Sequence, residues 1–285
     1  MGFTINQDNF EKTQIILESL DLLEWPTVCS HLSTFALTKQ GRKKCKSFDL
    51  PSDISISHEL LSQTLEIGSL DISLDGGISF QGVHDLENIL LTCAKGGIAT
   101  GEELIKVADT LKAARKLRKL IFDQLIRPRL SELLKDIATL PDLQQLLEFG
   151  LDEGGRIADR ASSKLSELRR HGNAVRLQRK DVLQNIIRKY SGLLQDHIVS
   201  ERYGRPVLAF KAGTSDKIKG MVHDSSASGN TIYVEPQAVI SIGNRLAQID
   251  SEISDEERRV LASWSKEVGI NANIIAHLGE KLLQI

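Results

Sequence analysis

Residues that would point to a disulfide-rich or strongly aromatic protein are scarce in this sequence. Its 285 residues include three cysteines, Cys29, Cys45 and Cys93, which are widely spaced and form no Cys-x-x-Cys pair. This pattern favours neither a disulfide framework nor a zinc knuckle, so we interpret the cysteines as reduced thiols in a cytoplasm-like compartment. Aromatic residues make up 5% of the chain and there are six prolines, while Leu, Ile, Lys, Glu and Arg recur at helical spacing. The composition therefore favours a mainly α protein.

Long apolar runs and an excess of charge of one sign are absent as well. No apolar run approaches the ~20 residues of a membrane span. The first fourteen residues carry acids at Asp8 and Glu11 and lack the apolar segment that a secretory signal needs. Thirty-six basic residues against 38 acidic ones leave a formal net charge of -2, so the bulk charge does not predict a nucleic-acid binder. We expect a cytoplasmic chain without a membrane partner, in which any electrostatic signal is local.

The residue patterns of common catalytic centres are also missing. The segment from Gly96 to Gly101 has the spacing of a phosphate loop, but Glu102 and Glu103 stand where Lys and Ser or Thr would be, and acids there would repel a phosphate. The seven histidines form no His-Glu-x-x-His pattern, and no Gly-x-Ser-x-Gly elbow occurs. The run from His223 to Ser226 is too short for a Ser-His-Asp relay and favours a structural turn. We predict no catalytic residue, no bound cofactor and no metal site in this chain.

The first half of the sequence has the pattern of packed helices. Apolar residues at helical spacing from about residue 10 to 48 fit two or three helices, interrupted at Pro26, and further breaks follow at Pro51 and in the Gly76 loop. Thr100 is a typical N-cap for a longer helix with a buried apolar face. We interpret residues 1–151 as one helical core domain.

Two long helical segments of opposite charge follow. Residues 156–189 hold ten Lys or Arg and only three acids, and an apolar three-four spacing runs through them with interruptions at Gly172 and Arg179. A second segment starts at Pro236 and carries the acids Asp250, Glu252, Asp255, Glu256 and Glu257 beside its own apolar spacing. Their opposite charges favour antiparallel pairing, as in a coiled coil, with each exposed ion pair contributing ~0.2–1 kcal/mol.

Between these helices the apolar period changes from helical to two. Short alternating runs around residues 197–199, 206–210, 218–223 and 231–234 predict four strands, with a turn-rich segment at 224–230. The expected fold is therefore mainly α, with a helical core, a long antiparallel helical lever and a small antiparallel β clamp inserted at its tip. The expected domains are 1–151 for the core, 152–195 for the outgoing lever, 196–235 for the clamp and 236–285 for the returning lever and core.

Several motifs in this order resemble one known family. The run from Gly220 to Pro236, GMVHDSSASGNTIYVEP, resembles the V-H-D-x-S-x-S-G-x-T-x-F/Y-x-E-P segment of the MutS family, closest to its type-two branch. RYGRPVLAFK, residues 202–211, is similar to the family's G-R-x-V-L-P-V-K strand pair. Further matches are Lys95-Gly96-Gly97 with ADTL at 108–111, and Asn244-Arg245-Leu246. Two departures are Ala209-Phe210 in place of Pro-Val, and Gly243 where the family has a bulkier residue.

The resemblance implies a helical core, a lever and a clamp that closes on DNA. Full-length relatives are ATPases that use ATP and Mg and act as homodimers, and the type-two branch is described as an endonuclease that suppresses recombination, within a family known for mismatch repair. No Walker A, Walker B or small nuclease segment occurs in residues 1–285, so the resemblance covers the core, lever and clamp alone. A fragment and a shortened homologue are both consistent with this sequence.

Two functions follow from these patterns. The first is a DNA-binding clamp that reads shape and phosphates of branched or duplex DNA, because basic residues and one tyrosine gather in the β segment. The candidate DNA-binding residues are Arg202, Tyr203, Arg205, Lys211, Lys217 and Lys219. The alternative is a helical protein-interaction module without DNA binding, either a coiled-coil adaptor or a ribosome-associated quality-control factor, since the type-two branch has been linked to stalled ribosomes.

Overall fold

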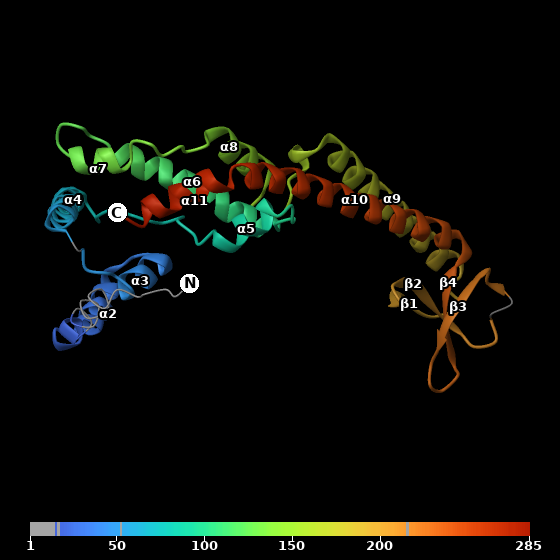
Figure 1. Cartoon of the computed structure of the whole chain (residues 1–285). Coiled ribbons are helices and arrows are strands. Elements are labelled where there is room, and N and C mark those ends of the chain that lie inside the picture. Colours follow the sequence, from blue (N-terminus) through green and yellow to red (C-terminus); the bar gives the residue numbers. More distant parts are fainter. Residues whose placement is uncertain (1–14, 16–17, 52, 215–216) are drawn as a thin grey trace, which may run out of the picture. The chain divides into compact units, whose positions relative to one another are not determined.

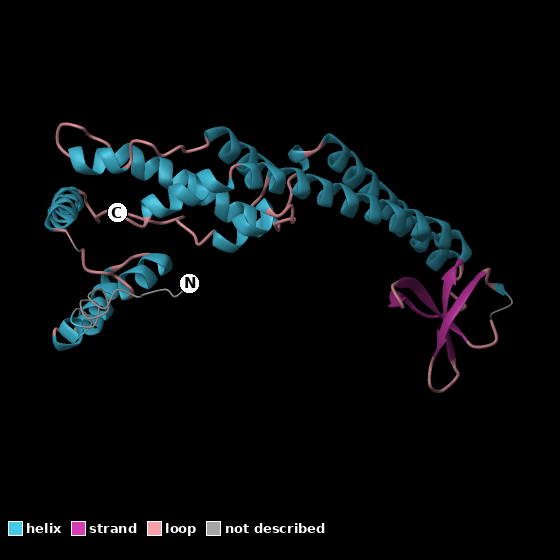
Figure 2. Cartoon of the chain, in the orientation of Figure 1, coloured by secondary structure: helices cyan, strands magenta, loops and turns pink. Residues whose placement is uncertain are grey.

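The computed structural model describes residues 15, 18–51, 53–214 and 217–285. It confirms the expected fold class, which is mainly helical with one small four-stranded antiparallel sheet (Figures 1 and 2). The chain divides into two compact units, which we name the core unit (Met1–Arg156 with Leu261–Ile285) and the arm unit (Ile157–Val260). Part of the first expected helix, residues 10–14 and 16–17, and the segment considered for a secretory signal, residues 1–14, lie outside the described residues.

The core unit consists of short and medium helices joined by turns. They are α2 (Trp25–Phe35), α3 (Lys39–Lys46), α4 (Ile54–Ser73), α5 (Glu87–Ala94), α6 (Gly101–Ile121), α7 (Pro128–Leu133), α8 (Pro141–Gly150), the end of α10 (Gln237–Ile270) and α11 (Ala272–Leu282). Helix α6 packs against α8 and α11, and α11 also packs against α5. Leu104 and Leu111 of α6 and Leu147 of α8 are fully buried in this core.

Helix α6 begins at Thr100, as its cap residue predicted. The Glu103 amide donates to the Thr100 hydroxyl at 3.3 Å, and the Thr100 amide donates to Oε2 of Glu103 at 2.8 Å. This capping box satisfies two amides that the helix itself cannot bond. Glu103, which replaces the hydroxyl residue of a phosphate loop, is therefore part of the helix start.

The arm unit holds two long helices and the sheet between them in the chain. Its elements are η1 (Asp159–Ala161), α9 (Ser163–Lys189), β1 (Leu194–Arg202), β2 (Arg205–Lys211), β3 (Gly220–Ser225), β4 (Thr231–Pro236) and the first part of α10. The sheet order is β1-β2-β4-β3, and every neighbouring pair is antiparallel. Figure 1 shows α9 and α10 side by side, with the strands at the end where α9 finishes and α10 starts.

Helices α9 and α10 pair through an apolar contact and flanking ion pairs. Val175 of α9 packs against Leu246 and Ile249 of α10. Gly172, which interrupted the apolar spacing in the sequence, is buried where the two helices approach, and a Cβ there would lie 3.3 Å from Cγ2 of Ile249. Gly172 therefore allows the close approach of α9 and α10, although it interrupts the apolar spacing in the sequence.

The opposite charges of the two helices form the expected ion pairs. Arg176 pairs with Asp250, Nη2 of Arg169 lies 2.6 Å from Oε1 of Glu257, and Nζ of Lys164 lies 3.6 Å from Oε2 of Glu256. Because Arg169 pairs with Glu257 while Arg176, further along α9, pairs with Asp250, which comes earlier in α10, the helices run antiparallel. The prediction of complementary antiparallel helices is confirmed.

A buried carboxylate fixes the beginning of α9 to α10. Glu256 is 1% exposed, and its Oε1 accepts bonds from Nη2 of Arg259 at 2.6 Å and from the Ser162 hydroxyl at 2.7 Å. Ser162 is also the N-cap of α9, because its oxygen accepts from the Leu165 amide at 3.3 Å. The bonds from Arg259 and Ser162 lower the pKa of Glu256 to about 2.

We expect acid to weaken this connection in a defined pH range. A carboxyl group whose pKa is lowered by folding stabilises the folded state fully above its ordinary value of 4.5, and this contribution is lost as the pH falls toward about 2. The protection factors of α9 amides, taken relative to the intrinsic exchange rate at each pH, should therefore fall over that range in the unchanged chain. E256Q should flatten this pH dependence and cost about 1 kcal/mol at neutral pH, whereas D255N at the exposed neighbour should retain it. Equal pH profiles for all three chains would contradict the assignment.

A pair of glycine substitutions tests the packing of the core unit. A Cβ at Gly150 would lie 2.3 Å from Cζ2 of Trp264, a buried side chain, so G150A should destabilise the unit by about 1–3 kcal/mol. Gly279 in α11 has nothing within 4 Å of the same position, and G279A should stabilise the helix by about 0.5–1 kcal/mol. Urea unfolding followed by tryptophan fluorescence measures both. A G150A chain at least as stable as the unchanged chain would show that the Trp264 contact is wrong.

Candidate nucleic-acid interface

One face of the sheet packs on α9 around a buried apolar cluster. Leu208 and Phe210 of β2 and Val234 of β4 form a buried cluster with Leu183 of α9. The Phe210 ring meets the Tyr190 ring edge-on, with centroids 6.4 Å apart. Phe210, which departs from the family pattern, thus occupies the centre of the cluster with no exposed surface.

A buried carboxylate joins the other face of the sheet to α10. Glu235 is 1% exposed, its Oε2 lies 2.8 Å from Nε2 of His223, and its Oε1 lies 3.7 Å from Nη1 of Arg205. The same Nη1 donates to Oδ1 of Asn244 in α10 at 3.0 Å. A Cβ at Gly243 would lie 3.2 Å from this Nη1, so the small residue leaves room for Arg205. Several residues of the family motifs therefore bond to one another.

A second cluster holds the ends of β1 and β3. The guanidinium of Arg202 lies 4.2 Å from the centroid of the Tyr233 ring, and its Nε lies 3.5 Å from Oδ2 of Asp224. Oδ1 of Asp224 accepts from the Ser225 amide at 2.8 Å. The turn predicted from Asp224 onward begins later, because Asp224 and Ser225 belong to β3 and pair with Tyr233 and Ile232 of β4. His223 bonds to Glu235 instead of to its neighbours in the chain.

The structure places the candidate DNA-binding residues in different surroundings. Arg202 and Arg205 have acidic partners, whereas Tyr203 is 83% exposed at the β1–β2 turn with a left-handed φ of 51°. Lys211 is exposed and donates to the Gly192 carbonyl at 3.1 Å. Within the described part of the chain, the exposed side chains of Lys217 and Lys219 have no hydrogen bond or ion pair.

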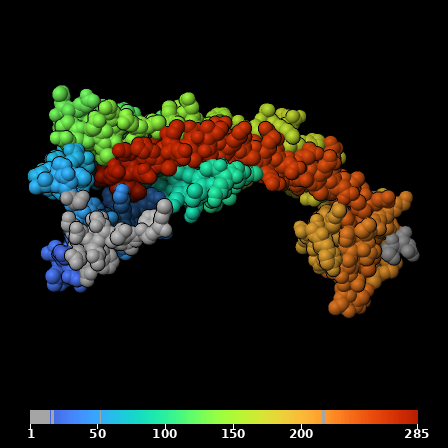
Figure 3. Space-filling model, viewed as in Figure 1, coloured from blue at the N-terminus to red at the C-terminus, as the bar shows by residue number. Residues whose placement is uncertain are grey.

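The six candidates do not form one cluster. Arg205 and Lys211 stand at opposite ends of β2, and strand geometry separates them by about 20 Å. The sheet and its loops form one continuous surface, coloured orange in the space-filling view (Figure 3). The candidates therefore lie along a surface, an arrangement suited to phosphates spaced along a backbone.

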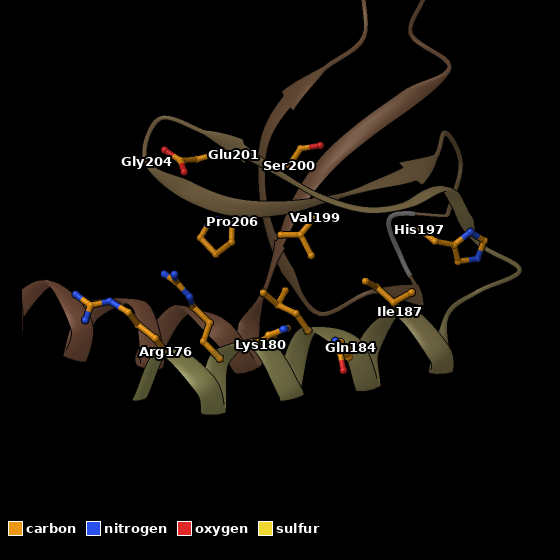
Figure 4. Close-up of a pocket in the computed structure, with 12 residues that line it drawn as sticks. Arg176, Lys180, Gln184, Ile187, His197, Val199, Ser200, Glu201, Gly204 and Pro206 are labelled. Atoms are coloured by element: carbon orange, nitrogen blue, oxygen red, sulfur yellow. The ribbon is translucent and has the colours of Figure 1, made fainter. Parts of the chain in front are cut away.

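A groove between α9 and the strands β1 and β2 was not predicted from the sequence. Its volume is about 550 Å³, and its basic lining residues are Arg176, Arg179, Lys180 and His197 (Figure 4). The excess of basic residues in 156–189 was the available signal. The sequence did not show which of them face the sheet, because that depends on how α9 packs.

Among the described residues, no group of three or more His, Cys, Asp or Glu side chains could hold a metal ion. None of the described helices is long and apolar enough to cross a membrane.

Comparison with known proteins gives similarity over most of the chain. No family model matches. Relatives include endonuclease MutS2 of Synechocystis sp., 42% identical over 251 residues, which are 88% of this chain and 30% of the relative. The endonuclease MutS2 of Pelotomaculum thermopropionicum is 33% identical over 261 residues, 90% of this chain and 33% of the relative. That of Symbiobacterium thermophilum is 30% identical over 270 residues, covering 94% and 34%. The chain thus spans about a third of the length of these relatives.

Substitution of Arg205 should lower the stability of the sheet more than substitution of Lys219. R205A removes the cation beside the buried Glu235 carboxylate, so we expect the sheet to lose about 1–2 kcal/mol. K219A removes an exposed, unpaired side chain and should change stability by less than about 0.5 kcal/mol. Hydrogen exchange of residues 194–236 measures both variants. Equal protection in R205A and the unchanged chain would refute the structural role of Arg205.

Proposed function

Because the chain is a relative of the MutS2 branch of the MutS family, as its motifs predicted, we propose that its arm unit binds DNA through the phosphate backbone. In this proposal residues 196–235 act as the clamp, residues 152–195 and 236–285 include the two halves of the lever, and residues 1–151 form the core. The ligand is duplex or branched DNA, and the cellular role is suppression of recombination in the cytoplasm.

The observation that carries the proposal is the set of free cations on the sheet and its loops. Lys211, Lys217 and Lys219 are exposed, and no acidic side chain of the described residues pairs with them. Lysines act as mobile point charges and contact phosphates without reading bases. Tyr203 is exposed in the β1–β2 turn, and its ring and hydroxyl offer apolar and polar contacts to DNA.

We infer that residues 1–285 contribute binding and not catalysis. The loop from Gly96 to Gly101, which has phosphate-loop spacing, leads into the capping box of Thr100 and Glu103, which places a carboxylate where a phosphate would lie. The endonuclease activity in the name of the relatives is therefore not assigned to these residues. ATP, Mg and the homodimer that the family resemblance implies are likewise assigned to the rest of such proteins.

Charge reversal of the free lysines tests the proposal. K211E/K217E/K219E should lower affinity for a labelled duplex and a four-way junction at least tenfold at about 50 mM salt, since backbone contacts dominate such affinity. The slope of log affinity against log salt should become shallower by about 2.7 because three phosphate contacts are lost. Fluorescence anisotropy measures both quantities.

K39E/K43E/K46E is the matched control, because it makes the same charge change at three exposed lysines of α3. It should leave binding nearly unchanged. DNA binding that survives the arm triple, or that does not depend on salt, would exclude the clamp. Absence of DNA binding together with intact association with another protein would favour the protein-interaction alternative.

A further inference from the structure

The groove between α9 and β1–β2 has two chemically different walls. We name it the α9–β1 groove. Arg176, Arg179 and Lys180 of α9 line it on one side, and His197, Ser200 and Glu201 of β1 line it on the other. Figure 4 shows α9 along one side and the strands along the other, with Ile187, Val199 and Pro206 between them. Charged and hydroxyl groups thus surround a short apolar floor.

The α9–β1 groove carries a net positive charge, and two of its cations have no ion-pair partner among the described residues. Arg176 is bound to Asp250 and donates to Oδ1 of Asn173 at 3.3 Å, so α10 and α9 hold it in place. Arg179 and Lys180 have no hydrogen bond or ion pair to any described side chain. Glu201 is the single acid of the lining. Arg179 and Lys180 together outweigh Glu201, and the resulting net positive charge favours an anionic ligand.

The dimensions of the groove select one kind of nucleic acid. Its volume of about 550 Å³ has room for a few phosphate, sugar or base groups of a single strand, and not for a whole duplex. A single strand fits because its phosphates can meet the cations while its sugars rest on the apolar floor. Free phosphate would be attracted by the same cations, but it has no apolar part that could contact Ile187, Val199 and Pro206.

The turn beside the groove supplies a surface for a base. Gly204 lines the groove, and Tyr203 directly precedes it with 83% of its surface exposed and a left-handed backbone. Exposed aromatic rings beside cationic grooves are common platforms on which the bases of a single strand stack, and Tyr203 is the chain neighbour of a lining residue. An apolar ring is otherwise costly to leave in water.

We propose that the α9–β1 groove binds a single-stranded nucleic-acid segment, with Arg179 and Lys180 on its phosphates and Tyr203 under a base. This deepens the proposed function, on which it rests for the class of ligand. The groove lies on the α9-facing side of the strands, so its residues are different from the lysines of the proposed duplex contact. A branched DNA contains duplex and single-stranded segments, so it presents a ligand for each surface to one arm unit.

The test uses the full chain and a fluorescent oligothymidylate of about twelve nucleotides, a length typical of such sites. R179Q/K180Q should weaken its binding at least about fivefold and make the salt slope shallower by about 1.4, since each phosphate contact on a single strand contributes about 0.7. Y203A should weaken binding without altering the slope. E201Q removes the acid of the groove and should strengthen binding about twofold, a gain that misfolding cannot produce.

Controls separate this idea from the proposed function and from free phosphate. K217Q/K219Q is the matched double variant and should lower oligothymidylate binding less than R179Q/K180Q does. Inorganic phosphate at the same phosphate concentration should not displace the oligonucleotide, and displacement would mean that the groove is a simple anion site. Unchanged oligothymidylate binding in both R179Q/K180Q and E201Q would overturn the proposal, even if the lysine triple had abolished duplex binding. Duplex binding that survives the lysine triple while the groove variants fail would overturn only the proposed clamp contact.

Discussion

The antiparallel pairing of α9 and α10 is the constraint on which the arm unit depends. The sheet is an insertion between these helices, and its first and last strands join them directly, so the strands can assemble only if the helix ends meet. Val175, Leu246 and Ile249 supply the apolar contact, and Gly172 permits the close approach. The ion pairs beside this contact contribute little individually in water. They fix the register, because only one alignment brings Arg169 to Glu257 and Arg176 to Asp250 together.

Buried carboxylates anchor this pairing near both ends of the helices. Glu256 binds the cap of α9 through Ser162, and Glu235 connects His223 and, through Arg205, the α10 residue Asn244. A buried carboxylate is stable only when cations and donors surround it, so each of these sites ties several segments to one point. The most specific motif residues, His223 and Glu235, are therefore explained by folding of the sheet onto α10. Membership of the most specific family motif therefore does not by itself identify a residue as a ligand contact.

The distribution of cations follows from the same argument. Arginines at 202 and 205 form ion pairs with acids within the sheet, where a planar guanidinium can contact several partners at once. Lysines at 211, 217 and 219 and the α9 pair Arg179 and Lys180 remain available to an external polyanion. A chain with a net charge of -2 can thus carry cationic surfaces, because acids outnumber cations on α10 and cations outnumber acids on α9.

The sequence by itself determined the type of each main element, the opposite charge of the two long helices and the family resemblance. Period-two spacing predicted the strands, Thr100 predicted the start of α6, and the motif from His223 to Glu235 predicted the relatives that were found. These features depend on local spacing, which a linear sequence preserves. Only the tertiary structure decided which cations are free: Arg202 lies next to Tyr203 in the chain but is bound to Asp224, which is distant in sequence. The α9–β1 groove could likewise be found only from the tertiary structure, since Lys180 and Ser200 face one another only after α9 packs on the sheet. Burial and pairing are properties of contacts between distant segments, and spacing along one segment does not encode them.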